Sequence, residues 1–222
     1  MALDFEIAPG ISVVFATPLL IRKMPDAESV NEGLRRAILK AEAEDASVEH
    51  SNVGGWQSPP TILEWPVPEI QTLQKWIEEA TIQLTSLPSE SPLEIAYHAY
   101  GWANINRNGH YNRVHNHGEE HWAVVYYVTC GEKESGHRMN GKIELRDPRP
   151  AASASADDKY FGYTFGAGLL IEPESSMLLA FPAWLDHCVH PFFGQGERIS
   201  IAVNVRLDNV RVTSEQEHPV SA

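Results

Sequence analysis

Three histidines and one arginine in the second half of the chain have the spacing of a metal site next to an anion site. His115 and His117 are separated by one residue, and His187 and Arg198 follow on later segments. On an extended strand, residues i and i+2 point to the same side about 7 Å apart, so both imidazoles of the pair can reach one ion at about 2 Å. A third imidazole from a distant strand leaves positions open for substrate and oxygen. The pattern predicts a mononuclear metal centre of the kind used by metal-dependent oxygenases.

A second ligand set is also compatible with the sequence. His117 and Glu119 form an H-x-E pair, and two histidines with one carboxylate are the set that non-haem iron(II) prefers. In this alternative Glu119 replaces His115, whereas residues 118–121 can equally form a solvated turn before the next strand. Other histidines lack a similarly placed partner, and a lone histidine more often satisfies a local hydrogen bond: His98, His110, His121 and His190.

The last predicted strand carries a candidate carboxylate anchor. Its residues alternate between an apolar face (Ile199, Ile201, Val203, Val205 and Leu207) and a second face (Arg198, Ser200, Ala202, Asn204 and Arg206). Arg198 and Ser200 offer a fork of donors and a hydroxyl to a carboxylate. If this face lines a barrel interior, the pair would hold the far end of a dicarboxylic acid whose keto-acid end chelates the metal. The alternative is an exposed edge, where Arg198 pairs with Glu197 or Asp208.

The elements that must position these side chains follow from hydrophobic periodicity. Apolar residues recur at helical spacing over residues 28–44 and 68–87, with a loop rich in Gly and Pro at 51–60 between them. From residue 93 the period changes to two, which predicts strands at Leu93–Asn106, Trp122–Cys130, Lys142–Leu145, Gly168–Glu172, Met177–Phe181 and Glu197–Leu207. Many short strands without intervening helices favour a mainly β fold with flanking α-helices, a double-stranded β-helix or jelly roll of cupin-like shape.

The length of 222 residues is that of one domain with a substantial core. We expect a single domain over 1–222, in which a helical part (1–92) packs on a jelly-roll core (93–207), followed by a polar tail (208–222). The stretch Pro148–Asp158 is rich in Pro, Ala, Ser and Asp, and predicts a mobile loop or lid.

Composition excludes several classes of protein. The formal net charge of -13 and the lack of a basic cluster argue against nucleic-acid binding. The apolar run Ile11–Ile21 is too short to span a bilayer and lacks the basic flank of a signal peptide, so no membrane anchor is expected. Cys130 and Cys188 have neither metal-type nor redox-type spacing, and two cysteines do not imply a disulfide framework, which makes the cytoplasm the default location.

These residues resemble the bacterial family named "Putative 2OG-Fe(II) oxygenase", within the 2-oxoglutarate- and iron-dependent dioxygenases, and the order of parts is similar to that of the prolyl hydroxylases. The resemblance covers nearly the whole chain. The segments that carry it are Phe15–Leu19, Ser51–Ser58, Trp102–Asn106, His115–His117, Tyr126–Val128, Phe181–His187 and Glu197–Asn204.

The resemblance implies iron(II) as cofactor, 2-oxoglutarate as cosubstrate and hydroxylation of a C–H bond by O2 with release of succinate and CO2. It implies His115, His117 and His187 as iron ligands, with no catalytic side chain beyond them. By the same resemblance Arg198 and Ser200 bind the distal carboxylate, and the weaker candidates for contacts to 2-oxoglutarate or substrate are Tyr111, Tyr127 and Asn204. The superfamily's usual H-x-D or H-x-E pair is H-x-H here, which leaves the iron site one charge unit more positive.

Two rival hypotheses remain at the level of sequence. Gly109 followed by His115-x-His117 fits the start of a cupin motif, but the glutamate expected four or five positions later is absent, and a cupin has no use for Arg198. A catalytically silent jelly-roll module is the other. The substrate, a small molecule or a protein, is not identified by the sequence, which is compatible with a homodimer. Trp102, Trp122 and Trp184 are candidates for a pocket but fit a core as well.

Overall fold

The computed structural model describes residues 5–8, 11–13, 16–87, 89, 91–149 and 168–213. At the start of the chain β1 (Phe5–Ala8) and β2 (Ile11–Val13) pair as a short antiparallel hairpin. Within the described residues, no helix combines the length and the apolar character needed to cross a bilayer.

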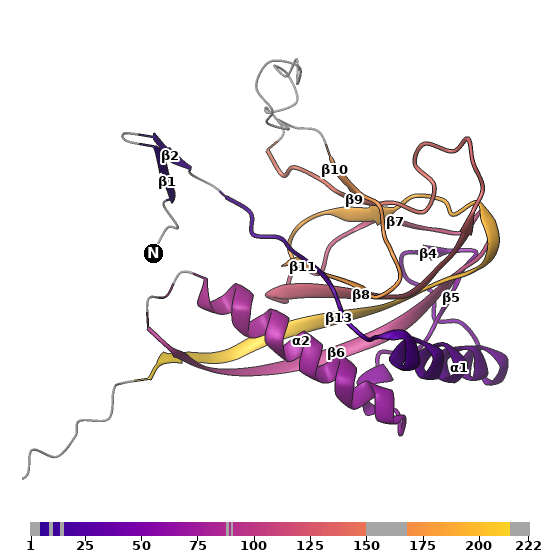
Figure 1. The fold of residues 1–222 in the computed structure, drawn as a ribbon, viewed down its shortest axis with the longest axis horizontal. Coiled ribbons are helices and arrows are strands. Elements are labelled where there is room, and N and C mark those ends of the chain that lie inside the picture. The colour runs from indigo at the N-terminus through magenta and orange to yellow at the C-terminus, as the bar shows by residue number, and fades with distance from the viewer. Residues whose placement is uncertain are drawn as a thin grey trace, which may run out of the picture.

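Two antiparallel sheets form the body of the fold (Figure 1). The larger has the strand order β3 (Leu20–Lys23), β11 (Met177–Pro182), β8 (Trp122–Lys133), β13 (Gly194–Val212), β6 (Leu93–Asn106) and β5 (Trp56–Gln57). The smaller has the order β10 (Leu169–Ile171), β9 (Ile143–Leu145), β12 (His187–Val189), β7 (Tyr111–His115) and β4 (Asn52–Val53). The predicted fold class, a mainly β jelly roll with flanking helices, is confirmed.

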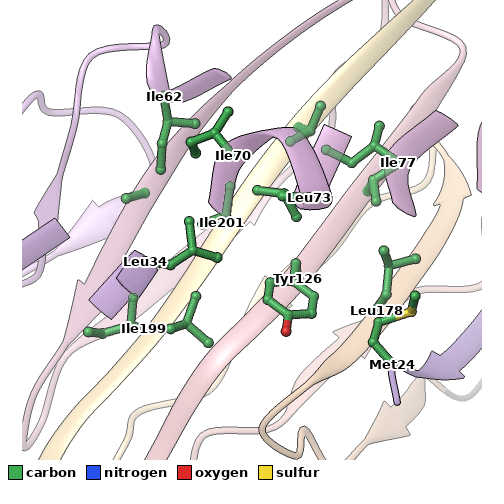
Figure 2. Packing of buried hydrophobic residues seen from close by; sticks show 14 of the residues in the cluster. Met24, Leu34, Ile62, Ile70, Leu73, Ile77, Tyr126, Leu178, Ile199 and Ile201 are labelled. Atoms are coloured by element: carbon green, nitrogen blue, oxygen red, sulfur yellow. The ribbon is translucent and has the colours of Figure 1, made fainter. Parts of the chain in front are cut away.

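Helices cover the outer face of the larger sheet. They are α1 (Glu28–Glu44) and α2 (Pro68–Ser86), with the short 3-10 helix η1 (Ile62–Glu64) between them. Pro68 suits the first turn of α2, and buried residues such as Leu73 and Ile77 recur at helical spacing along it. Figure 2 shows these side chains above Ile201 of β13 and Tyr126 of β8. This first core fixes the position of the sheet that carries Arg198.

A second core lies between the two sheets. Tyr127, Leu179 and Phe181 of the larger sheet pack with Ile143 and Leu145 of the smaller one. Strand alternation decides which residues enter this space, because successive side chains point to opposite faces. On β13 the residues Ile199, Ile201, Val203 and Val205 pack in the helix-side core, so Arg198, Ser200 and Asn204 face the interior between the sheets.

The strand β13 is longer at both ends than the sequence predicted. It begins at Gly194 and continues to Val212, and its last residues pair with Leu93–Ala96 of β6. The start of the predicted polar tail is therefore strand, since an available partner strand satisfies its backbone groups. The predicted loop 51–60 contains the two-residue strands β4 and β5. Residues 150–158 of the predicted lid and 214–222 of the tail lie outside the described residues.

Candidate metal centre

The imidazoles of His115, His117 and His187 lie close together in the fold. His115 is the last residue of β7 and pairs directly with His187, the first residue of β12. The ring of His115 lies 4.3 Å from that of His187 and 5.1 Å from that of His117, and the remaining pair is 5.2 Å apart, all between ring centroids. One nitrogen of each ring lies within 4.8 Å of the other two. This is close enough for one ion to contact all three.

Backbone carbonyls fix the orientation of two of these rings. His115 Nδ1 lies 2.7 Å from the carbonyl oxygen of Arg113, and His187 Nδ1 lies 2.9 Å from that of Leu185. A carbonyl oxygen only accepts, so each Nδ1 carries the hydrogen and each Nε2 presents a lone pair. This arrangement is the usual support of a metal-binding histidine.

The environment keeps the three imidazoles neutral. Burial lowers the pKa of His117 to about 3, and the neighbouring His187 and His115 add to this effect. Burial, followed by the proximity of His115, lowers the pKa of His187 to about 4. Burial also lowers the pKa of His115, against the opposing effect of its hydrogen bond to Arg113. Neutral imidazole is the form that binds a metal ion.

Hydrogen bonds connect the two short segments that flank the histidines. The His117 backbone N–H donates to the carbonyl of Ala183 at 2.8 Å, and Asn116 Nδ2 donates to Asp186 Oδ1 at 2.7 Å. These bonds join the segment after β7 to the one before β12. Because both segments carry histidines of the cluster, their mutual position sets the geometry of the site.

Glu119, the alternative ligand, lies outside this cluster. Its side chain is 93% exposed, and its carboxylate lies 3.7 Å from the guanidinium of Arg206. The described structure thus brings together the three histidines rather than His117 with a carboxylate.

Arg198 is buried in the interior with an incomplete set of partners. The residue is 1% exposed, and its Nε donates to the carbonyl of Gly141 at 3.3 Å. Its guanidinium lies over the ring of Tyr127, 5.1 Å from the centroid. Among the described residues, neither Arg198 Nη2 nor the Tyr127 hydroxyl has a hydrogen-bond partner. The alternative of an exposed edge is wrong, and Glu197 pairs instead with Arg35 at 2.8 Å.

Strand register relates this arginine to the histidines. Arg198 pairs with Asn106 of β6, and Asn106 Nδ2 donates across the interior to Asn112 Oδ1 of β7 at 3.3 Å. Asn112 in turn pairs with Val189, two residues beyond His187. These contacts connect the strand that carries Arg198 with the strands that carry His115 and His187 across the interior.

A cavity of about 740 Å³ opens beside the imidazoles. Tyr100, Trp102 and Asn204 line it from the larger sheet, and Asn204 Nδ2 donates to the Tyr100 hydroxyl at 3.1 Å. The remaining lining residues come from β7 with the segment after it, from β5 and from the loops between α1 and η1: Arg113, Val114, His115, Asn116, His117, Gln57, Glu49, His50, Ser51 and Pro60.

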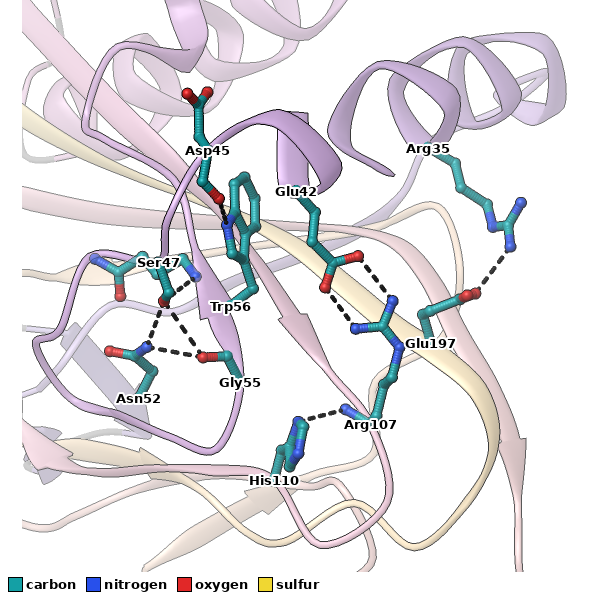
Figure 3. Close-up of polar contacts among 11 residues, drawn as sticks. Arg35, Glu42, Asp45, Ser47, Asn52, Gly55, Trp56, Arg107, His110 and Glu197 are labelled. Atoms are coloured by element: carbon teal, nitrogen blue, oxygen red, sulfur yellow. Dashed lines mark hydrogen bonds and ion pairs between the residues drawn. The ribbon is translucent and has the colours of Figure 1, made fainter. Parts of the chain in front are cut away.

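The loop that forms one wall of this cavity is held by side chains (Figure 3). Trp56 Nε1 donates to the carbonyl of Asp45 at 3.0 Å, and Ser47 Oγ accepts from Asn52 Nδ2 at 3.3 Å. Nearby, both terminal nitrogens of Arg107 donate to the carboxylate of Glu42 in α1. The wall is thereby anchored to the helical layer before any ligand binds.

The other residues predicted to contact 2-oxoglutarate or substrate do not all face the interior. Ser200 is buried beside Tyr127 in the β13–β8 register, and Asn204 lines the cavity. Tyr111 is half-buried next to Asn112 in β7, so the two side chains point to opposite faces and Tyr111 points away from the interior. Among the tryptophans, Trp102 lines the cavity, whereas Trp122 packs on the helix-side core and Trp184 is exposed.

Three interior asparagines were not predicted from the sequence. Asn104 and Asn106 of β6 pair with Ser200 and Arg198, and Asn112 of β7 faces them. Among the described residues, Asn104 Oδ1 and Asn106 Oδ1 have no hydrogen-bond partner. Their alternation with the buried Ala103 and Ile105 is the signal that would have indicated an interior polar face.

Comparison with known proteins finds a family match for the segment that contains this site. Residues 100–204 match the profile of the family described as "Putative 2OG-Fe(II) oxygenase". This segment is just under half of the 222-residue chain and includes all three histidines and Arg198. No curated protein matches the chain.

Solved structures share the fold at low sequence identity. A prolyl-4-hydroxylase from Pseudomonas putida matches with a TM-score of 0.59 and 12% identity over 87% of this chain and 94% of the other. HygX from Streptomyces hygroscopicus, with nickel and 2-oxoglutarate bound, matches with a TM-score of 0.54 and 11% identity over 86% and 83%. The epimerase SnoN from nogalamycin biosynthesis matches with a TM-score of 0.58 and 9% identity over 88% and 80%.

Proposed function

We propose that this protein is an iron(II)- and 2-oxoglutarate-dependent oxygenase that hydroxylates a C–H bond of a small molecule or a protein side chain. The observation that carries the proposal is the pairing of two incomplete sites. Three neutral imidazoles converge without an acidic partner in the cluster, and a buried arginine nearby lacks a partner for Nη2 among the described residues.

The donor set fits the two groups that the family uses. His115, His117 and His187 would hold the iron, since each is neutral and two have Nε2 directed away from a backbone bond. Arg198 would hold the distal carboxylate of 2-oxoglutarate, together with the hydroxyls of Tyr127 and Ser200. When bound, the iron and 2-oxoglutarate supply the oxidation of a C–H bond by O2, with release of succinate and CO2.

The chain's own contribution is binding, orientation and exclusion of water. No carboxylate of the described residues pairs with the buried Arg198, so a carboxylate that reaches it would neutralise its charge, which favours binding of a dianion. Burial raises the pKa of Tyr127 to about 12, so its hydroxyl keeps the proton and donates to that carboxylate. Phe181, 5.0 Å from the ring of His187, shields the ligand side of the site from solvent. The proposal requires no side chain as general acid or base.

The cavity supports a substrate of mixed character. Tyr100 and Trp102 offer aromatic surface on one wall, and Glu49 and Arg113 place charges of both signs on the opposite loop and strand. We propose that Asn204 contacts the substrate, because its side chain reaches the cavity together with Tyr100. Tyr111 has no such role in this proposal, because it points away from the interior.

The two rival hypotheses do not explain why Arg198 is buried. In a cupin-like enzyme that does not use 2-oxoglutarate, or in a silent jelly-roll module, burial of the Arg198 donor that lacks a partner among the described residues would cost about 1–3 kcal/mol. No ligand of either protein would offset this cost. A different oxidation remains a second candidate, because the same fold occurs in the epimerase SnoN.

Succinate formation tests the proposal. Wild-type protein supplied with iron(II), 2-oxoglutarate and O2 is expected to release succinate, and His187→Ala is expected to release none. His98, exposed on β6, provides the matched control, and His98→Ala should behave as wild type. Equal succinate from wild type and His187→Ala would overturn the proposal.

A further inference from the structure

A second cluster of potential metal ligands lies away from the three histidines. Glu144 belongs to β9, Cys188 to β12, and His190 follows β12 directly. Glu144 Oε2 lies 2.8 Å from His190 Nε2 and 3.8 Å from Cys188 Sγ. One ligand atom of each residue lies within 4.8 Å of the other two.

This cluster occupies the opposite face of the smaller sheet. Cys188 pairs directly with Glu144, and the neighbouring pair is His187 with Leu145. Leu145 packs in the core between the sheets, so His187 points inward while Cys188 and Glu144 point outward. The two clusters are thus separated by the sheet itself and share no side chain.

The chemistry of the donors favours a divalent transition metal. A thiolate is a soft ligand, imidazole is intermediate and a carboxylate is hard, and zinc(II) accepts all three. With ligands at about 2.0–2.3 Å, neighbouring donor atoms of a tetrahedral zinc site are about 3.3–3.8 Å apart. The 3.8 Å between Glu144 and Cys188 lies in this range, whereas the 2.8 Å between Glu144 and His190 is a hydrogen bond that an ion would replace by a small separation of the two side chains. We propose that Glu144, Cys188 and His190 form a second metal site for an ion of the zinc(II) type, independent of the proposed iron site.

The residues around Glu144, Cys188 and His190 hold these side chains in place and leave them partly open to solvent. Cys188 is buried, whereas the side chains of His190 and Glu144 are 22% and 19% exposed, which leaves a path for an ion. A Cβ on Gly168 would fall 2.4 Å from Glu144 Oε1, so this glycine gives the carboxylate its space. Arg146 Nε approaches the same Oε1 at 3.7 Å, on the oxygen that His190 does not contact.

Binding must displace a proton from the thiol. In the free protein the Cys188 S–H group donates to Glu144 Oε2 at 3.8 Å. An incoming metal ion takes the sulfur lone pair, and the thiol proton passes to solvent. The sulfur also gives the site a spectroscopic signature that three imidazoles cannot produce.

Titration with cobalt(II) under anaerobic conditions tests the proposal. The wild type is expected to show the near-ultraviolet thiolate-to-cobalt charge-transfer band and to bind two cobalt ions per chain. Cys188→Ser should lose the band and bind one ion. Cys130→Ser, which changes the other buried cysteine, should keep the band, and so should His187→Ala. The last variant separates this site from the proposed iron site, so failure of one leaves the other intact.

His190→Gln provides a second test if Cys188→Ser does not fold. Because the His190 side chain is partly exposed, we expect this position to tolerate substitution. The band in His190→Gln should require at least about 10-fold more cobalt than in the wild type. No band in the wild type at excess cobalt, or an unchanged band in Cys188→Ser, would overturn the proposal.

Discussion

His115 and His187 face each other as a register pair between β7 and β12, and each ring is held by the backbone carbonyl two residues before it. The two imidazoles therefore present Nε2 from the same kind of support on neighbouring strands. A rotation of either ring would break a hydrogen bond, which pre-organises the pair before an ion arrives. The third ring, His117, lies beyond the end of the strand and is positioned by its backbone bond to Ala183.

Removal of one imidazole should abolish tight iron binding. His187→Ala leaves two ligands, and we expect its iron(II) dissociation constant to rise at least about 100-fold, beyond the range seen when only a supporting residue is lost. Equilibrium dialysis against iron(II) measures this. His98→Ala serves as the matched control, and an unchanged affinity in His187→Ala would contradict the assigned ligand set.

Replacement of Arg198 should weaken binding of 2-oxoglutarate selectively. Arg198→Met removes a charged hydrogen-bond donor of about 1.5–3 kcal/mol, which corresponds to roughly a 10- to 150-fold increase in the dissociation constant. Arg206 lies on the same face of β13 but is solvent-accessible and contacts Glu119 and Glu120. Arg206→Met should therefore bind 2-oxoglutarate as the wild type does, in calorimetric titrations with iron-loaded protein.

The same Arg198→Met variant should fold without 2-oxoglutarate nearly as well as wild type. It loses a 3.3 Å bond to Gly141 and a contact with the Tyr127 ring, but it also removes a buried charge that lacks a partner for Nη2 among the described residues. These effects oppose each other, so the free energy of unfolding should change by less than about 1 kcal/mol. A large loss in urea denaturation would identify Arg198 as a structural residue instead.

Two adjacent tyrosines should respond in opposite ways to loss of their hydroxyls. The Tyr126 hydroxyl donates to Asn31 Oδ1 at 2.6 Å on the helix side, so Tyr126→Phe should cost about 0.5–1.5 kcal/mol of stability and leave 2-oxoglutarate binding unchanged. The hydroxyl of Tyr127 lacks a partner in the described interior, so Tyr127→Phe should preserve stability and weaken 2-oxoglutarate binding several-fold. Denaturation of both variants measures their stability, and calorimetric titration measures their binding of 2-oxoglutarate. Loss of stability in Tyr127→Phe with unchanged binding would refute the assignment.

Asp186 should support the metal centre from the adjacent loop. Its carboxylate accepts a 2.7 Å bond from Asn116, and its charge acts on both His115 and His187. A set of three neutral ligands has no negative charge of its own, so this carboxylate partly compensates the ion. Asp186→Asn should lower iron(II) affinity about 3- to 10-fold, whereas Asp208→Asn, a change near the end of β13, should not. Equal affinities in dialysis would show that the carboxylate has no such role.

The sequence predicted the elements well where hydrophobic period and local signals agree. The predicted strand Leu93–Asn106 and helix 28–44 have the observed bounds, since alternation in the first and helical spacing in the second are continuous. The same alternation placed Arg198 on the face of β13 opposite the uniformly apolar one, and left open whether that second face is interior or exposed. The structure buries it.

Features that depend on strand register were not accessible from the sequence. The irregular pairing between β7 and β12 aligns Asn112 with Val189 although His115 faces His187, and no local signal encodes this shift. The approach of Glu144 to Cys188 and His190 also depends on which strands are neighbours. Spacing along the chain gave no hint of that cluster, since its members are separated in sequence and join only through β9–β12 pairing.

We propose that iron(II) and 2-oxoglutarate bind together at this site. Anaerobic titration of metal-free protein with both, followed by visible absorption, tests it most directly. We predict the charge-transfer band of a keto acid chelated to iron(II) in the wild type, at unchanged 2-oxoglutarate concentrations in Arg206→Met and at much higher concentrations in Arg198→Met. Absence of the band in wild-type protein that holds stoichiometric iron would contradict the account.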